Sequence, residues 1–236
     1  RALALARGGA APPLWLGWGL VALLAGRHVS AALENQSHDL LVLLPIAFAF
    51  GAWRSNQRTL AGALCGIGAA CKATPLLFGL LFTVRRSVFG VLGLIGAVVG
   101  ATLLPDLLYP RVDGQLWVKA WIDTFLTGLR PGETAAAAGA WNANSFLNQS
   151  LSGTVHRLVT PTVDDPSRFM LDVAPITASP GLRSALILAA SAAVLAWLAW
   201  LGWCRRGESE VLSDNPSLAQ FSAVVCGMVL LSPMSS

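Results

Sequence analysis

One stretch limits what this chain can fold into more than any other feature: the run from Ser184 to Trp203 contains no charged residue. As an α-helix rising 1.5 Å per residue, it is long enough to cross the ~30 Å hydrocarbon core of a bilayer. A second uncharged run extends from Ser87 to Leu104. Only 12% of the residues are charged and 55% are hydrophobic, whereas about 25% are charged in a typical soluble domain. The sequence therefore predicts an all-α integral membrane protein.

A series of apolar segments makes up one predicted membrane domain, residues 1–236. The segments are 11–27, 35–53, 59–72, 73–84, 87–108, 183–203 and 217–231. Residues 59–84 would suit a single tilted span, but Lys72 and Pro75 lie near its middle, and a lysine in mid-membrane costs about 3 kcal/mol. Two half-length helices with Lys72 at the tip of a hairpin avoid this cost, and proline suits the first turn of the second helix.

The arginines give the orientation of these segments. With the hairpin, three pairs fall on one side of the membrane: Arg54 and Arg58, Arg85 and Arg86, and Arg205 and Arg206. The positive-inside rule makes that side the cytoplasm. We therefore expect a multi-pass protein of the cell (plasma or inner) membrane, with residues 109–182 forming a long external loop.

This external loop is patterned rather than featureless. From Asp113 to Leu129, polar residues recur every four positions and apolar residues occupy the opposite side. The pattern predicts an amphipathic helix at the membrane interface, with Trp117 and Trp121 at the level of the headgroups. Apolar residues at helical spacing predict a second short helix within Ser145–Val159.

Composition and motifs exclude several classes of protein. The net charge is +4 and the basic residues form no stripe, so nucleic acid is not an expected partner. The four cysteines fall in apolar segments or at their ends, which argues against a disulfide framework. No zinc-ligand spacing, phosphate-binding loop or dinucleotide fingerprint occurs, so we expect neither a metal nor a cofactor. The chain begins at Arg1 rather than Met, and we expect it to be a piece of a longer protein.

The polar segment from Glu34 to Asp39 has two interpretations. It lies directly before an apolar helix, and a helix start is stabilised by a capping side chain and by acids near the positive end of the dipole. Capping, however, needs only one or two such residues. Polar groups at a membrane cavity are usually functional, so Gln36 and His38 are candidate substrate-binding residues.

Four polar residues elsewhere in the chain also carry two interpretations each. Lys72 either snorkels to the interface or contacts a phosphate, for which lysine is an effective point charge. Asn148 and Gln149 either cap a helix or bind sugar hydroxyls, and Asn148-Gln149-Ser150 also matches the glycosylation acceptor pattern. His156 is either a surface or hydrogen-bonded histidine or a functional one. All four are candidate substrate-binding residues.

Several local patterns together resemble glycosyltransferase family 87, within the GT-C superfamily. The resemblance runs from about Leu14 to Ser236, and its most telling motif is Lys72-Ala73-Thr74-Pro75 after a helix of small residues. The other matching patterns are Asn35-Gln36, Arg85-Arg86, Asn148-Gln149-Ser150-Leu151 with Arg157-Leu158, and the closing Leu231-Ser232-Pro233-Met234-Ser235.

This resemblance implies a GT-C-like bundle of transmembrane helices whose long external loop bears short amphipathic helices. It also implies transfer of a mannose-like sugar from a polyprenyl-phosphate donor to a lipid or cell-envelope glycan acceptor on the outer face. The family uses an aspartate on an early outer loop as general base. That aspartate is expected upstream of Arg1, which leaves the enzyme incomplete here, with Glu34 and Asp39 as weak stand-ins. The family's Gly-Gln-x-Asn form is matched directly by Gln36 alone.

A non-catalytic transporter or lipid flippase is the alternative, because it too would place Lys72 and polar turns at a membrane cavity. Transporters tend to contain paired halves with similar broken helices. The sequence contains no second copy of the break at Lys72, which favours the enzyme.

Overall fold

The computed structural model describes residues 39–126, 148, 150–161, 176–204 and 214–232. The chain forms two compact units, residues 1–41 and 42–236, and of the first unit only residues 39–41 are described. Throughout the described residues, the regular structure is helical. The prediction of an all-α fold is therefore confirmed for this part of the chain.

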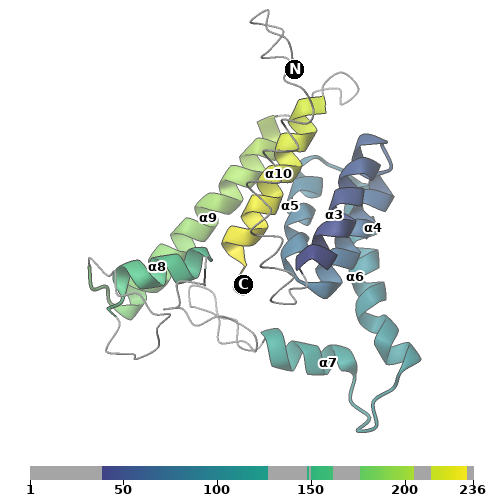
Figure 1. Ribbon diagram of the computed structural model, residues 1–236, viewed down its shortest axis with the longest axis horizontal. Helices are drawn as coiled ribbons and strands as arrows, with labels where there is room; N and C mark the ends of the chain where they lie inside the picture. The colour runs from purple at the N-terminus through teal and green to yellow at the C-terminus, as the bar shows by residue number, and fades with distance from the viewer. Residues whose placement is uncertain (1–38, 127–147, 149, 162–175, 205–213, 233–236) are drawn as a thin grey trace, which may run out of the picture. The chain divides into compact units, whose positions relative to one another are not determined.

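The helices are labelled in Figure 1. In chain order they are α3 (Asp39–Arg54), α4 (Arg58–Cys71), the 3₁₀ turn η1 (Thr74–Leu76), α5 (Leu77–Val84), α6 (Val88–Leu108), α7 (Trp117–Trp121), the π-helical turn η2 (Ile122–Leu126), α8 (Leu151–Val159), α9 (Pro180–Cys204) and α10 (Asp214–Leu231). By length and composition, α6 and α9 could each cross a membrane. The other apolar helices are shorter.

The segment containing Lys72 and Pro75 forms two helices. Helix α4 ends at Cys71, and Lys72 takes an extended conformation while its backbone N–H donates to the Gly68 carbonyl, 3.0 Å away. Pro75 then lies in the first turn of η1, where its missing N–H has no intrahelical partner to lose. At 14 residues, α4 is about 21 Å long, which is too short to cross a bilayer.

Glycines hold α4 against α6 at close range. A Cβ atom added to Gly62 would collide with the Gly90 carbonyl, and one added to Gly66 would lie 2.5 Å from the Leu94 carbonyl oxygen. These pairings advance along both helices in the same direction, so α4 and α6 are parallel and begin at the same end (Figure 1). Small residues allow this kind of backbone approach in membrane bundles.

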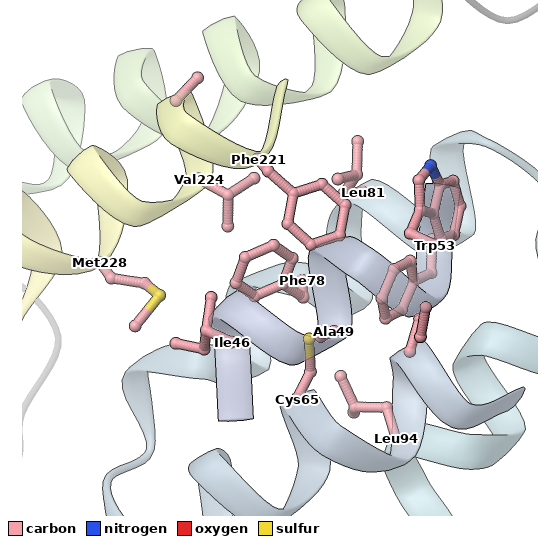
Figure 2. Packing of buried hydrophobic residues seen from close by; sticks show 14 of the residues in the cluster. Ile46, Ala49, Trp53, Cys65, Phe78, Leu81, Leu94, Phe221, Val224 and Met228 are labelled. Carbon is pink, nitrogen blue, oxygen red and sulfur yellow. The ribbon is translucent and has the colours of Figure 1, made fainter. Parts of the chain in front are cut away.

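Aromatic side chains from three helices form the centre of the core (Figure 2). Phe78 of α5 lies 4.8 Å from Phe221 of α10, between ring centroids, and Trp53 of α3 stacks on Phe82 of α5 at 5.2 Å. All four side chains are buried. Because such rings bury large apolar areas, this cluster ties α3, α5 and α10 together.

The turns before α4 and before α6 share one backbone design. In each, a residue adopts the left-handed conformation, Asn56 at φ 59° and Arg86 at φ 54°. The following N–H then donates to the carbonyl five residues earlier, from Gln57 to Ala52 at 2.9 Å and from Ser87 to Phe82 at 2.8 Å. This is the Schellman motif, in which glycine is the usual left-handed residue.

We expect Arg86→Gly to stabilise the protein. Glycine removes the left-handed strain of about 1–2 kcal/mol, although its greater freedom in the unfolded chain offsets about 0.4–1 kcal/mol, so the net gain is about 0.5–1 kcal/mol. Arg85→Gly is the matched control, since Arg85 has an ordinary φ of −76° and glycine there relieves no left-handed strain. Thermal unfolding in detergent should raise the melting temperature of the first variant and lower that of the second. Equal shifts of the two melting temperatures would contradict backbone strain at Arg86.

Candidate functional site

Lys72 lies at the turn between α4 and η1, and its side chain is half-buried. The pairing of Gly66 with Leu94 places the end of α4 level with residue 99 of α6. Helix α6 continues to Leu108, roughly 13 Å further at 1.5 Å per residue. Lys72 is therefore recessed relative to the end of α6.

A buried polar turn precedes α8. The Asn148 side-chain oxygen accepts hydrogen bonds from the Ser150 N–H, at 3.1 Å, and from the Ser150 hydroxyl, at 2.5 Å. The Ser150 hydroxyl in turn accepts from the Gly153 N–H at 3.0 Å and caps the helix. A Cβ atom at Gly153, in the first turn of α8, would lie 2.6 Å from the Asn148 oxygen, so a larger residue there would displace the Asn148 side chain. Ser150 rather than Asn148 therefore caps α8, and Asn148 Oδ1 orders the turn before it. A sugar contact of Asn148 stays a prediction.

Three basic side chains meet where α8 packs against α9. Arg157 is buried; its Nη1 donates to the Asn148 carbonyl at 2.7 Å and its Nη2 to the Thr154 hydroxyl at 3.3 Å. Arg183 of α9 donates to the Thr160 hydroxyl at 3.5 Å. Burial, followed by the positive charges of Arg183 and Arg157, lowers the pKa of His156.

His156 is therefore neutral at pH 7, because its pKa lies below the ordinary value of about 6.5. Its Nδ1 atom is buried and makes no hydrogen bond within the described part of the chain. A neutral imidazole with an unused ring nitrogen can exchange a hydrogen bond with a hydroxyl group. His156 can therefore make one further hydrogen bond through Nδ1. Its contact with a substrate stays a prediction.

Helix α10 lies against both regions that contain candidate residues, the turn after Lys72 and helix α8. It packs against η1, which begins two residues after Lys72, and also against α8. Ser232, directly after α10, is buried.

Among the predicted site residues, Glu34, Gln36, His38 and Gln149 lie outside the described residues. Asp39 is the first residue of α3.

The amphipathic helix predicted over Asp113–Leu129 begins later than predicted, and the prediction of its start at Asp113 was wrong. Helix α7 begins at Trp117, because Asp113 is held in the preceding turn by an ion pair with Arg111 at 2.6 Å. That ion pair and its hydrogen bonds lower the pKa of Asp113. The helix predicted within Ser145–Val159 likewise begins only at Leu151, after the Ser150 cap.

Asp106 fixes this corner between α6 and α7, and the sequence analysis did not single it out. Its carboxylate accepts from the backbone N–H groups of Trp117 and of Val118, the latter at 3.3 Å. The Trp117 indole N–H donates to the Tyr109 carbonyl at 2.6 Å. A carboxylate suits the positive end of a helix, so Asp106, two residues before the end of α6, fixes the start of α7.

Comparison with known proteins gives one match. The model of glycosyltransferase family 87 matches residues 1–233. No curated protein and no solved structure matches the chain. Among the described residues, no group of three or more histidines, cysteines or acids could hold a metal ion.

Proposed function

This chain belongs to glycosyltransferase family 87, and we propose that it transfers a mannose-like sugar from a polyprenyl-phosphate donor to a lipid or cell-envelope acceptor on the outer face of the cell membrane. Family membership makes it a glycosyltransferase. The observation that carries the finer proposal is the break at Lys72, which sets a cationic side chain at the end of a half-length helix.

Exposed apolar surface supports the placement in a membrane. The side chains of α6 and α9 are mostly exposed although both helices are apolar, as expected where lipid rather than water is the solvent. The outward residues include Leu92, Ile95, Leu188 and Trp200. We propose that these two helices span a bilayer and that the shorter helices complete a multi-pass bundle.

The parallel arrangement of α4 and α6 supports the proposed orientation. Because both helices begin at the same end, the turn with Arg54 and Arg58 and the turn with Arg85 and Arg86 lie on one side. The positive-inside rule makes that side cytoplasmic. Lys72 then faces the outer half of the membrane, and α7 follows the outer end of α6.

The proposed chemistry is a displacement at the anomeric carbon of the donor. The acceptor oxygen forms a bond to that carbon while the bond to the phosphate oxygen breaks, and the electron pair leaves with the phosphate. The acceptor proton passes to a carboxylate that acts as general base. Lys72 is proposed to stabilise the charge that develops on the leaving phosphate.

Sugar transfer by the full-length protein tests this function. Reconstituted in liposomes with polyprenyl-phosphate mannose and candidate acceptors, it is expected to give a glycosylated product and free polyprenyl phosphate. Uptake of a solute in the absence of donor, together with no transfer from any polyprenyl-phosphate sugar, would instead support the transporter alternative.

Cysteine labelling tests the orientation. On a background without the four native cysteines, Val112→Cys, at a fully exposed position between α6 and α7, should react with an impermeant maleimide added outside intact cells. Gln57→Cys, in the exposed turn before α4, should react only after permeabilisation. Labelling of position 57 in intact cells would show that the orientation is the opposite of the proposed one.

A further inference from the structure

Two turns at one end of the helices concentrate positive charge. Arg54 and Arg58 flank the turn before α4, and Arg85 and Arg86 lie in the turn before α6. The close contacts between α4 and α6 place both turns at the same end. The surface that the two turns form carries these four arginines, and residues 54–59 and 84–88 themselves include no acid.

The same surface presents two helix starts that no side chain caps. Neither Gln57 before α4 nor Ser87 before α6 makes a capping hydrogen bond. The Ser87 hydroxyl is buried and has no hydrogen-bond partner within the described residues. Parallel helix starts without a side-chain cap add their positive dipole ends to the charge of the arginines.

The aromatic core holds part of this charge in place. The Arg58 guanidinium lies over the Trp53 ring, 3.7 Å from its centroid. Trp53 is itself buried and stacked on Phe82, so the ring is a fixed support. Such cation–π contacts orient a guanidinium without neutralising it.

Exposed apolar side chains adjoin the arginines on the membrane side. Val88 and Phe89, in the first turn of α6, are 63% and 67% exposed, and Leu60 in the first turn of α4 is 47% exposed. A soluble phosphate would leave these side chains uncovered. A phospholipid would cover them with its acyl chains while its headgroup lies beside the arginines.

We propose that the turns 54–58 and 85–87 form a binding surface for the phosphate headgroup of an anionic phospholipid in the cytoplasmic leaflet. The proposal rests on the membrane placement given under the proposed function. Negatively charged lipids are enriched in that leaflet, and each nearby arginine adds to their attraction. This lipid is distinct from the polyprenyl-phosphate donor, which is proposed to bind on the opposite side.

Native mass spectrometry of the full-length protein tests the proposal. Released from nanodiscs with equal amounts of phosphatidylglycerol and phosphatidylcholine, the parent should retain an excess of phosphatidylglycerol. Arg85→Gln and Arg86→Gly should each reduce the retained ratio by about fivefold. Arg86→Gly removes the charge at a position where glycine is the favoured residue, so reduced retention cannot be attributed to misfolding if its melting temperature is not reduced.

Lys119→Gln is the matched control, because Lys119 is an exposed cation on α7, outside the two turns, and its ratio should equal that of the parent. An unchanged ratio in both arginine variants, or an equal loss in the Lys119 variant, would overturn the proposed surface. Displacement of the retained lipid by soluble glycerol phosphate would overturn the assignment to a lipid. Sugar transfer measured on the same samples separates the two proposals, since transfer with no lipid preference contradicts only this one.

Discussion

Gly93→Ala is expected to destabilise the protein by about 2–3 kcal/mol, although alanine is ordinarily the better helix former. A Cβ atom at Gly93 would collide with the Thr59 carbonyl and lie 3.1 Å from the Ala63 nitrogen. Both atoms belong to the backbone of α4, so no side chain can rotate away and the helices must separate. Overpacking of this kind typically costs 1–3 kcal/mol, and the separation would also loosen the contacts at Gly62 and Gly66.

Gly96→Ala is the matched control, on the same helix and with the same change of chemistry. Nothing lies within 4 Å of a Cβ atom at Gly96, so alanine there should be neutral or stabilise by up to about 1 kcal/mol through its helix propensity. In one detergent, the melting temperature should therefore fall by roughly 5–10 °C for Gly93→Ala and stay level or rise for Gly96→Ala. A similar shift for both variants would mean that α4 and α6 are not in close contact.

The sequence predicted this helix pairing only in part. Lys72 and Pro75 signal the break between α4 and η1 because a buried charge and a missing N–H are both local penalties, and the helix ends there. The sequence does not predict which residue of α6 each glycine of α4 contacts. Gly62 and Gly90 are far apart along the chain and meet only after α5 has reversed its direction, which no local pattern encodes.

The start of α7 illustrates the same limit. The four-residue repeat from Asp113 predicts a helix, yet Asp113 accepts from Arg111 and from the Gln115 N–H within a turn. The cap of α7 comes instead from Asp106, eleven residues before Trp117. Periodicity measures which side of a helix is apolar, whereas the helix boundary depends on a hydrogen bond from another element.

The candidate site shows which groups need the structure to be recognised. Asn148 was singled out for its amide, and its side-chain oxygen proves to order the turn before α8. In the sequence Arg157 stands out only in the Arg157-Leu158 pattern, yet it is buried and donates to the Asn148 carbonyl. Arg183 precedes an uncharged run and draws no notice in the sequence, but its charge adds to burial in lowering the pKa of His156.

Lys72→Gln is expected to reduce kcat/KM for the polyprenyl-phosphate sugar by about 10- to 150-fold, measured with the full-length enzyme. A charge-assisted hydrogen bond to the phosphate is worth about 1.5–3 kcal/mol, and glutamine keeps a polar side chain at the turn while removing the charge. Lys72→Arg should retain part of the activity, because the charge survives although its shape and reach differ. Lys119→Gln, which removes an exposed lysine that pairs with Asp123, should stay within a few-fold of the parent.

The competing interpretation, that Lys72 only snorkels to a polar surface, gives a different result for the same variant. Any polar residue would then serve, and Lys72→Gln would keep its donor kinetics within a few-fold. Because α4 ends directly before Lys72, the comparison requires that the variant match the parent in melting temperature and yield. A well-folded Lys72→Gln enzyme with parental kcat/KM would remove Lys72 from the phosphate site, and the leaving phosphate would then need another cation, for which Arg157 and Arg183 beside α8 are the described candidates.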